Sequence, residues 1–163
     1  MLEITFGFVK PHAYENRDAI GRMITDSGLE ILQTKDPYLF TREKAAEFYD
    51  VHRTQPFFAP LVDSITSGGS ALYIVGGSDA LNRLSRLAGP TDPLDADPWT
   101  IRGMYGGALP NNAFHRSDSH ETVRREIGLT FSPEELMIPD TYLQVLSSWP
   151  ISISFLARSI TPP

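Results

Sequence analysis

The 163-residue chain is predicted to fold as one α+β domain, with helices packed on a four-stranded antiparallel sheet. Three observations predict this class. Short apolar runs alternate with helical patterns along the chain. The length is that of a single domain, and such a chain can bury about 70% of its unfolded surface. The absence of cysteine excludes a disulfide framework and thiolate metal sites, so an apolar core must hold the fold together.

The predicted elements follow the order β-α-β-β-α-β, with extra helices between them. Strands are expected at residues 4–9, 29–40, 71–75 and 113–115. Helices are expected at residues 19–27, 42–52, 58–66 and 80–88, and from Ser117 or Ser119 through 127. This order corresponds to the ferredoxin-like plan, an antiparallel sheet with helices on one face.

Local signals set the ends of several elements. Gly28 suits a left-handed helix C-cap, and Thr41 is a typical N-cap. Residues 89–112 are rich in Pro, Gly and Asp and predict a long ordered loop. Residues 132–135, SPEE, predict a helix start.

The chain divides into a predicted domain at residues 1–138 and a C-terminal extension at 139–163. The extension contains Trp149, Ile151, Ile153 and Phe155. We expect it to pack on the domain or on a neighbouring subunit.

The charge balance argues against generic nucleic-acid binding. The net charge is −6, from 14 basic and 20 acidic residues, and no basic run could neutralise a phosphate backbone. Two or three cations can still be focused in one cleft. The strongly apolar stretch at residues 71–77 is too short to cross a bilayer, and no signal peptide is evident. We expect a cytoplasmic protein with no membrane or nucleic-acid partner.

The densest group of reactive side chains is residues 112–119, NAFHRSDS, followed by Glu126. This group resembles the hallmark of nucleoside diphosphate kinases, N-x-x-H-G-S-D-S with a later Glu. Other segments match the family in the same order: FGFVKP at 6–11, Tyr49 with PFF at 56–58, GPTDP at 89–93, TIRG at 100–103 and FSPEEL at 131–136. The resemblance covers about residues 4–136.

The resemblance implies transfer of the γ-phosphate from a nucleoside triphosphate to a nucleoside diphosphate by a ping-pong mechanism. A neutral imidazole suits such a relay, because it is nucleophilic near pH 7 and its phosphoramidate stays reactive. The implied catalytic residues are the nucleophile His115, its orienting acid Glu126, and Lys10, Tyr49 and Ser117. The nucleotide-binding candidates are Lys10, Phe57, Leu61, Thr91, Arg102 and Asn112, together with Arg86 and Arg116 as nearby cations.

We expect no protein metal site, and Mg²⁺ is expected to arrive with the nucleotide. His12, His52 and His120 are expected to be surface residues without metal-ligand spacing. The resemblance also implies a homo-oligomer: a dimer, tetramer or hexamer. The loop at residues 91–112 occupies the region where the family's subunit contacts tend to lie.

Several candidate site residues also have structural alternatives. Lys10 suits a solvated strand end, and one of Phe57 and Phe58 belongs in the core. Arg102 has Asp95 and Asp97 as nearby partners, and Glu126 has Arg124 and Arg125.

The chain departs from the family pattern at two positions that bear on the phosphates. Arg116 replaces the small residue after the nucleophile, and Ser85 stands where the family has a phosphate-binding arginine. Arg86 is one helical position away, a rotation of about 100°. We expect Arg116 to offset the missing cation by approaching the same phosphates from the opposite wall, so Arg116→Gly should reduce turnover.

Smaller departures are His12 in place of Asp, a one-residue insertion between Lys10 and Gly21, and an unusual loop at 104–111. Arg116 and Ser85 predict an enzyme of reduced activity. They also leave two alternatives open. One is a silent nucleotide-binding family member that acts as a sensor or scaffold, and the other is an unrelated ferredoxin-like ligand-binding module.

Overall fold

The computed structural model describes residues 1–149. Four strands form one antiparallel sheet in the order β2-β3-β1-β4. They are β1 (Leu2–Val9), β2 (Glu30–Tyr38), β3 (Ser70–Ser78) and β4 (Phe114–Arg116). The predicted fold class and strand count are confirmed.

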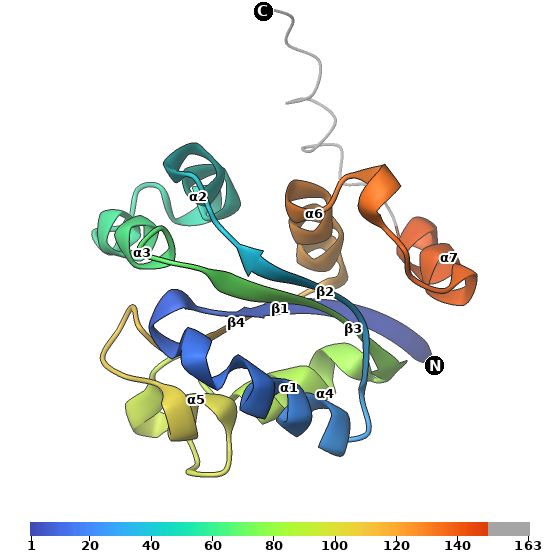
Figure 1. Ribbon diagram of the computed structural model, residues 1–163, viewed down its shortest axis with the longest axis horizontal. Helices are drawn as coiled ribbons and strands as arrows, with labels where there is room; N and C mark the ends of the chain where they lie inside the picture. Colours follow the sequence, from blue (N-terminus) through green and yellow to red (C-terminus); the bar gives the residue numbers. More distant parts are fainter. Residues whose placement is uncertain (150–163) are drawn as a thin grey trace, which may run out of the picture.

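Helices cover both faces of this sheet (Figure 1). One face carries α1 (Arg17–Asp26), α4 (Ala80–Ala88) and α5 (Ile101–Tyr105). The other carries α2 (Arg42–Phe48), α3 (Phe58–Ile65), α6 (His120–Thr130) and α7 (Asp140–Ser148). The two helices of the βαββαβ core, α1 and α4, lie on one face as predicted, and additional helices cover the other face. Cover on both faces is needed because β3 is buried from Ser70 to Gly77.

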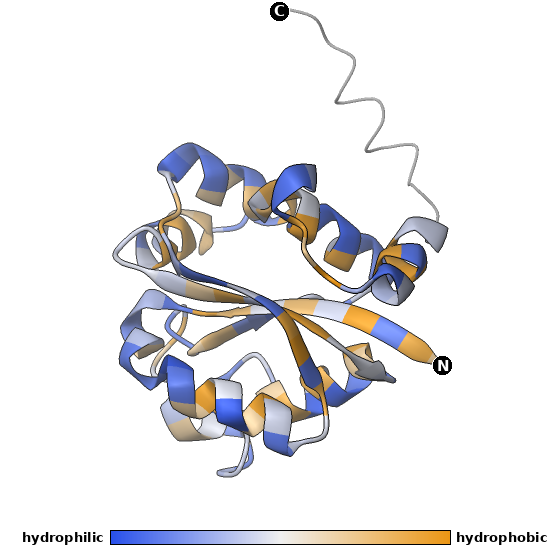
Figure 2. Ribbon diagram, turned by 45° about the vertical axis from the view of Figure 1, so that its right-hand side comes forward, coloured by the Kyte–Doolittle hydropathy of each residue, from blue (hydrophilic) through white to orange (hydrophobic). Residues whose placement is uncertain are grey.

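The central strands supply two apolar cores, since side chains alternate between the faces of a sheet. Phe6 and Phe8 of β1 and Ile74 of β3 join the core beneath α2, α3 and α6. Tyr73 and Val75 join the core beneath α1 and α4. Figure 2 shows apolar residues running along the strands, while the helices mix apolar and polar residues around their circumference.

Capping residues begin and end the helices largely as predicted. The Thr41 side chain accepts a 3.1 Å hydrogen bond from the Lys44 amide. Ser119, rather than Ser117, caps α6, and Gly28 takes a positive φ of 80° after α1. The predicted helix at 42–52 is divided, since α2 ends at Phe48 and a 3-10 turn follows at Asp50–His52.

Besides the 3-10 helix at Pro11–Asn16, three further short elements were not predicted. The loop at residues 89–112 contains a 3-10 turn at Pro93–Asp95 and the helix α5. The third is α7, which packs on the sheet with the ring of Tyr142 against Gly76. The predicted helix start at 132–135 forms only a 3-10 turn at Pro133–Glu135, although its capping box is present.

The predicted extension begins with α7, which lies on the domain. Trp149 is the last described residue, and Ile151, Ile153 and Phe155 lie outside the described residues. The boundary at 138 therefore stays a prediction. Among residues 1–149, no helix has both the length and the apolar character needed to cross a membrane.

Candidate active site

A cleft of about 830 Å³ opens where β4 forms the edge of the sheet. Its walls come from the segment between α2 and α3, from the beginning of α6 and from the loop at 89–112. Ten predicted site residues line it: Lys10, Tyr49, Phe57, Leu61, Thr91, Arg102, Asn112, His115, Arg116 and Glu126. Ser117 is buried beside the cleft, and Arg86 does not line it.

His115 on β4 is held by Glu126 on α6. Its Nε2 lies 3.0 Å from Oε2 of Glu126, and the same oxygen accepts a 2.6 Å hydrogen bond from the hydroxyl of Ser117. A carboxylate oxygen only accepts hydrogen bonds, so Nε2 carries the ring proton and Nδ1 keeps its lone pair. Nδ1 has no hydrogen-bond partner in the described part of the chain, which leaves it as the nucleophilic atom.

Aromatic side chains fix the plane of the His115 ring. The ring of Phe8 stacks on it with centroids 4.9 Å apart. Phe48 meets it edge-on at 5.1 Å, and Tyr49 does so at 5.8 Å. The imidazole therefore has little freedom to rotate away from the cleft.

Three cations, Lys10, Arg102 and Arg116, form what we call the cation cluster. Burial and the charge of Arg102 lower the pKa of Lys10 to about 7. Burial and the charge of Arg116 lower the pKa of Arg102 to about 10. The charges thus influence one another and concentrate positive potential beside the nucleophile.

Backbone carbonyls hold two members of this cluster. Lys10 donates from Nζ to Pro110 at 2.9 Å. Arg102 donates from Nε and Nη2 to the carbonyl of Phe114, and from Nη1 to that of Gly89 at 2.8 Å. These acceptors are neutral, so they fix the side chains without cancelling their charge.

Three buried polar atoms of the lining have no partner in residues 1–149: the hydroxyl of Tyr49, Oδ1 of Asn112 and Nε of Arg116. Nδ2 of Asn112 donates to the carbonyl of Thr91 at 2.8 Å, which aligns the amide. Burial and nearby Glu126 raise the pKa of Tyr49, so it remains a neutral hydroxyl. Buried polar groups normally have partners, and these three point to a polar ligand.

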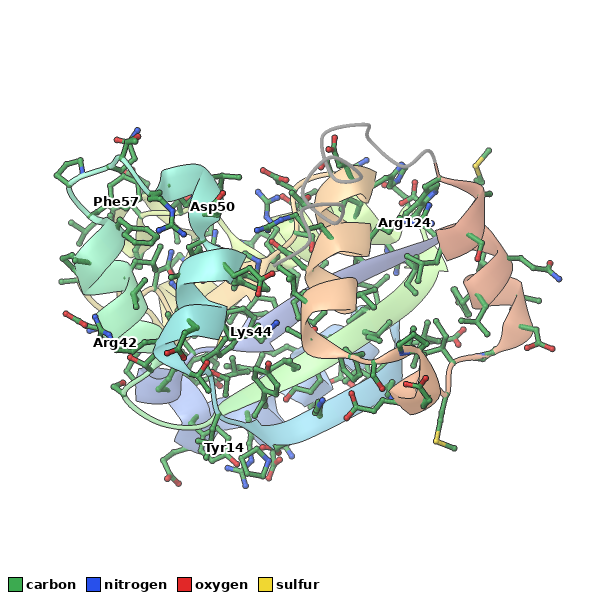
Figure 3. All side chains as sticks on the ribbon, turned by 90° about the horizontal axis from the view of Figure 1, so that it is seen from above. Tyr14, Arg42, Lys44, Asp50, Phe57 and Arg124 are labelled. Atoms are coloured by element: carbon green, nitrogen blue, oxygen red, sulfur yellow. The ribbon has the colours of Figure 1, made fainter. Side chains whose placement is uncertain are left out.

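The outer end of the cleft is apolar. Phe57 precedes α3 and is 47% exposed, and Leu61 lies one turn further along the helix (Figure 3). Phe58 packs against the core, so Phe57 is the one of this pair that lines the cleft. Its exposed ring offers a face on which a planar group can stack.

The structural alternatives for the charged candidates are wrong. Lys10 is only 4% exposed, so it is not a solvated strand end. Arg102 bonds to backbone carbonyls and pairs with neither Asp95 nor Asp97. Glu126 is buried against His115, whereas Arg124 and Arg125 donate to the carbonyls of Trp149, Phe48 and Glu47.

Known proteins resemble this chain in sequence and in fold. A model of the family described as nucleoside diphosphate kinase matches residues 3–136. The chain belongs to the nucleoside diphosphate kinase family. Family members transfer phosphate between nucleotides, and the chain is an enzyme of this kind. An unrelated ferredoxin-like module is therefore excluded, and a silent nucleotide binder is not favoured.

Individual members of the nucleoside diphosphate kinase family match over most of the chain. The enzyme of Rickettsia canadensis is 38% identical over 139 residues, which cover 83% of this chain and 98% of that protein. The crystal structure from Aquifex aeolicus has a TM-score of 0.77 and 38% identity, covering 84% of this chain and all of that one. The structure from Halobacterium salinarum, in complex with CDP, has a TM-score of 0.79 and 34% identity, covering 96% and 98%.

Two arginines, Arg86 and Arg116, are candidates to replace the cation that is missing at Ser85, and the structure places them differently. Arg86 on α4 is exposed, and its Nη2 lies 3.6 Å from Oδ2 of Asp79, so the structure does not bring it to the cleft. Arg116 does line the cleft. By strand alternation it leaves β4 on the same face as Phe114, the face that α4 covers with Ser85. Its approach to the phosphates from the wall opposite Ser85 stays a prediction.

Two histidines expected at the surface have defined surroundings. His52 lines the cleft, with its ring 5.4 Å from Phe57 and 6.3 Å from Tyr49. Its position three residues after Tyr49, about one helical turn, was the signal that could have placed it there. The ring of His120 stacks on Trp149 at 4.3 Å.

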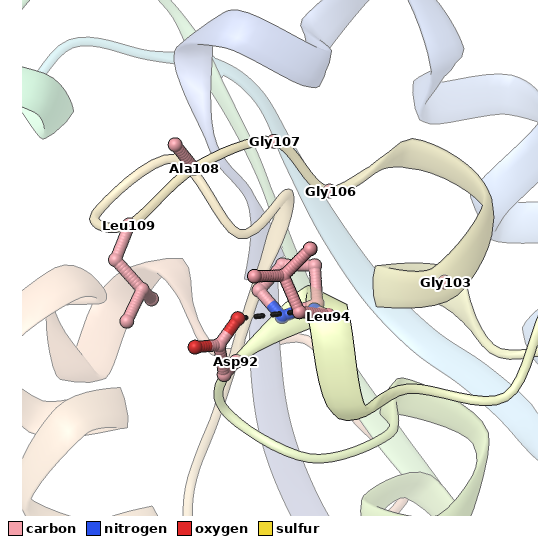
Figure 4. Close-up of a pocket in the computed structure, with 8 residues that line it drawn as sticks. Asp92, Leu94, Gly103, Gly106, Gly107, Ala108 and Leu109 are labelled. Atoms are coloured by element: carbon pink, nitrogen blue, oxygen red, sulfur yellow. Dashed lines mark hydrogen bonds between the residues drawn. The ribbon is translucent and has the colours of Figure 1, made fainter.

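A second hollow, of about 380 Å³, lies on the loop at 89–112 (Figure 4). Leu94 and Leu109 line it together with small residues. Its one acidic side chain, Asp92, already accepts a 3.0 Å hydrogen bond from the amide of Leu94. This hollow offers no reactive group of its own.

Proposed function

We propose that the chain moves the terminal phosphoryl group of a nucleoside triphosphate to a nucleoside diphosphate in two half-reactions, with His115 carrying the group between them. The strongest support is the 3.0 Å contact between Nε2 of His115 and Glu126, because it leaves Nδ1 with a free lone pair. The cation cluster beside the ring supplies the charge that a polyphosphate needs.

In the first half-reaction, Nδ1 attacks the terminal phosphorus of the triphosphate. The bond from phosphorus to the bridging oxygen breaks, and the diphosphate leaves with the electron pair. In the second, a terminal oxygen of another diphosphate attacks the phosphorus and the phosphorus–nitrogen bond breaks. Glu126 keeps the proton on Nε2 throughout and partners the positive charge of the phosphorylated ring.

The remaining lining residues hold the nucleotide. Phe57 stacks on the base without selecting it, since every base presents a π-face, and Leu61 borders the same slot. Asn112 and Lys10 bond the ribose hydroxyls, and Thr91 supplies a hydroxyl to phosphate. The hydroxyls of Tyr49 and Ser117 and the guanidinium of Arg102 complete the catalytic end.

Mg²⁺ enters with the nucleotide in this proposal. Residues 1–149 bring together no group of three or more histidine, aspartate or glutamate side chains that could hold an ion. Asp118 and Glu121 line the cleft and suit hydrogen bonds from the waters of a phosphate-bound ion. When bound, the ion neutralises charge on the phosphates.

We further propose that the chain forms a homo-oligomer through the loop at 89–112. Exposed apolar side chains gather there: Leu94, Trp99, Met104 and Leu109 are each more than half exposed. Exposed apolar side chains concentrated on one loop suit an interface between proteins. Dimer, tetramer or hexamer, and the cytoplasmic location, stay predictions.

Labelling with γ-labelled ATP and Mg²⁺ tests the covalent relay. We expect acid-labile, base-stable label on the wild-type chain that chases onto added GDP. His115→Ala should carry no label, and His12→Ala, which removes an exposed histidine, should label normally. Nucleotide-dependent thermal stabilisation without label would instead indicate a silent binding protein, and label retained in His115→Ala would contradict the proposed nucleophile.

A further inference from the structure

The cation cluster has no acidic partner. Among the ion pairs within residues 1–149, none involves Lys10, Arg102 or Arg116. The chain has a net charge of −6, so carboxylates are plentiful elsewhere. Three neighbouring cations without a counter-charge are costly when partly buried, and a bound anion removes that cost.

Arg116 has the most unused hydrogen-bonding capacity of the three. A guanidinium carries five N–H groups. Only Nη1 donates within the described chain, at 3.2 Å to the carbonyl of Ser117. Nε is buried without a partner, although the side chain lines the cleft. Arg102, by contrast, already donates hydrogen bonds from all three of its guanidinium nitrogens to backbone carbonyls.

The backbone sets where this guanidinium can reach. Arg116 directly follows His115 on β4, at the register position opposite Gly7 of β1. Side chains of consecutive strand residues leave on opposite faces, so His115 and Arg116 approach the edge of the sheet from its two sides. Both side chains nevertheless line the same cleft, so a phosphate chain whose terminal group meets His115 can also contact Arg116.

We infer that Arg116 is a phosphate-binding residue that contacts the terminal or next-to-terminal phosphate of the bound nucleotide, and so selects di- and triphosphates over monophosphates. This inference rests on the proposed function. It assigns Arg116 a positive role in place of obstruction of the phosphate. From β4 it supplies the cation that Ser85 on α4 does not provide.

The test compares binding of a nucleoside monophosphate and a diphosphate with the same base, by calorimetry. In Arg116→Ala we expect diphosphate affinity to fall about tenfold or more, since bonds to charged groups are among the stronger ones. Monophosphate affinity should be nearly unchanged. Arg116→Lys should retain part of the preference, because the charge remains while the forked geometry is lost. Arg86→Ala removes an exposed arginine from outside the cleft and should bind both nucleotides as the wild type does.

Two results would overturn the inference: an unchanged ratio of diphosphate to monophosphate affinity in Arg116→Ala, whether or not both affinities fall, or faster turnover in Arg116→Gly. Melting temperatures without nucleotide separate misfolding from lost contacts, and Arg116→Lys provides the comparison if the alanine variant unfolds. A wild-type chain that binds no diphosphate would defeat the proposed function as well. A wild type that labels normally, with Arg116→Ala binding unchanged, would defeat this inference alone.

Discussion

At residue 126 one carboxylate oxygen serves two donors, Nε2 of His115 and the hydroxyl of Ser117. The first bond selects the tautomer of the ring, and the second holds the carboxylate in place. Both donors and the acceptor are largely buried, so water does not compete for these bonds. The orientation of the nucleophile therefore depends on the charge and the acceptor character of this one side chain.

Glu126→Gln keeps the shape of the side chain but removes the charge and adds two donors. The amide can turn its NH₂ group toward Nε2, which would then lose its proton and leave Nδ1 protonated. We expect the rate of phosphohistidine formation to fall on the order of 10²-fold or more. Single-turnover labelling measures this rate.

Nucleotide affinity of Glu126→Gln should change little, because Glu126 bonds to the nucleophile and not to the phosphates. Glu134→Gln is the matched control, since Glu134 is exposed and far along the chain from the histidine. Equal labelling rates in Glu126→Gln and wild type would refute the orienting role.

The contact between residues 115 and 126 was predictable because one short motif carries both partners at a fixed spacing. The position of Arg86 was harder to predict, since one helical step turns a side chain by about 100° and decides between cleft and solvent. Partners of Arg102 are backbone carbonyls, and no residue type in the sequence identifies those. The sequence motif thus indicates which residues react, whereas the folded backbone determines which groups bond to them.

Among the elements, the short helix α5 delivers Arg102 to the cleft. Thr100 caps it by accepting from the amide of Gly103 at 3.1 Å and donating to the carbonyl of Asp97 at 2.7 Å. A Cβ atom at Gly103 would lie 2.0 Å from that same carbonyl oxygen. The turn therefore closes tightly enough to require glycine, and Arg102 precedes it directly.

Gly103→Ala should destabilise the fold by about 1–3 kcal/mol, the usual cost of overpacking. It should also weaken nucleoside diphosphate binding, because relief of the clash moves α5 and with it Arg102. Gly128→Ala on α6 is the control: nothing lies within 4 Å of a Cβ there, and alanine should stabilise the helix by about 0.5–1 kcal/mol. Denaturant unfolding measures both variants, and a neutral or stabilising effect of Gly103→Ala would show that the turn is loose.

The helices α5 and α7 show which elements the sequence pattern alone cannot predict. With five residues, α5 is too short to show a 3.6-residue period, and its threonine cap and its glycine are residue types that are also typical of a loop. The helix α7 is held by tertiary contact, with Tyr142 filling the space that glycine leaves at position 76. Strand β1 was predictable from its alternation of large apolar residues with Thr5 and Gly7, and β3 from its continuous apolar run at residues 71–75.

At the scale of the whole molecule, the cation cluster concentrates positive charge in one cleft of a protein whose net charge is −6. Lys10 has a pKa of about 7 in the empty cleft, against 10.5 for the ordinary side chain, because of burial and the charge of Arg102. Between these two pH values the unfolded chain binds more protons than the folded one. The free energy of unfolding therefore gains a contribution that rises with pH across this window in the absence of ligand.

In the folded chain above pH 7, Lys10 is largely deprotonated, and nucleotide binding should cause it to take up a proton. Phosphate charge beside Lys10 favours its ammonium form and raises its pKa. At pH 8 the empty cleft leaves Lys10 about one-tenth charged, and the terminal phosphate of the free nucleotide is already largely ionised. Binding of a nucleoside diphosphate at pH 8 should therefore take up close to one proton, and at pH 6, where Lys10 is already charged, much less from this group.

Calorimetry at pH 8 in two buffers of different ionisation enthalpy measures the number of protons directly. Lys10→Met should abolish the uptake. Lys35→Met, which removes a lysine paired with Glu135 outside the cleft, should leave it intact. Proton release at pH 8, or equal uptake in Lys10→Met, would mean that another group carries the proton. Uptake specific to Lys10 would show that burial and the charge of Arg102 keep this lysine largely uncharged above neutral pH until phosphate binds.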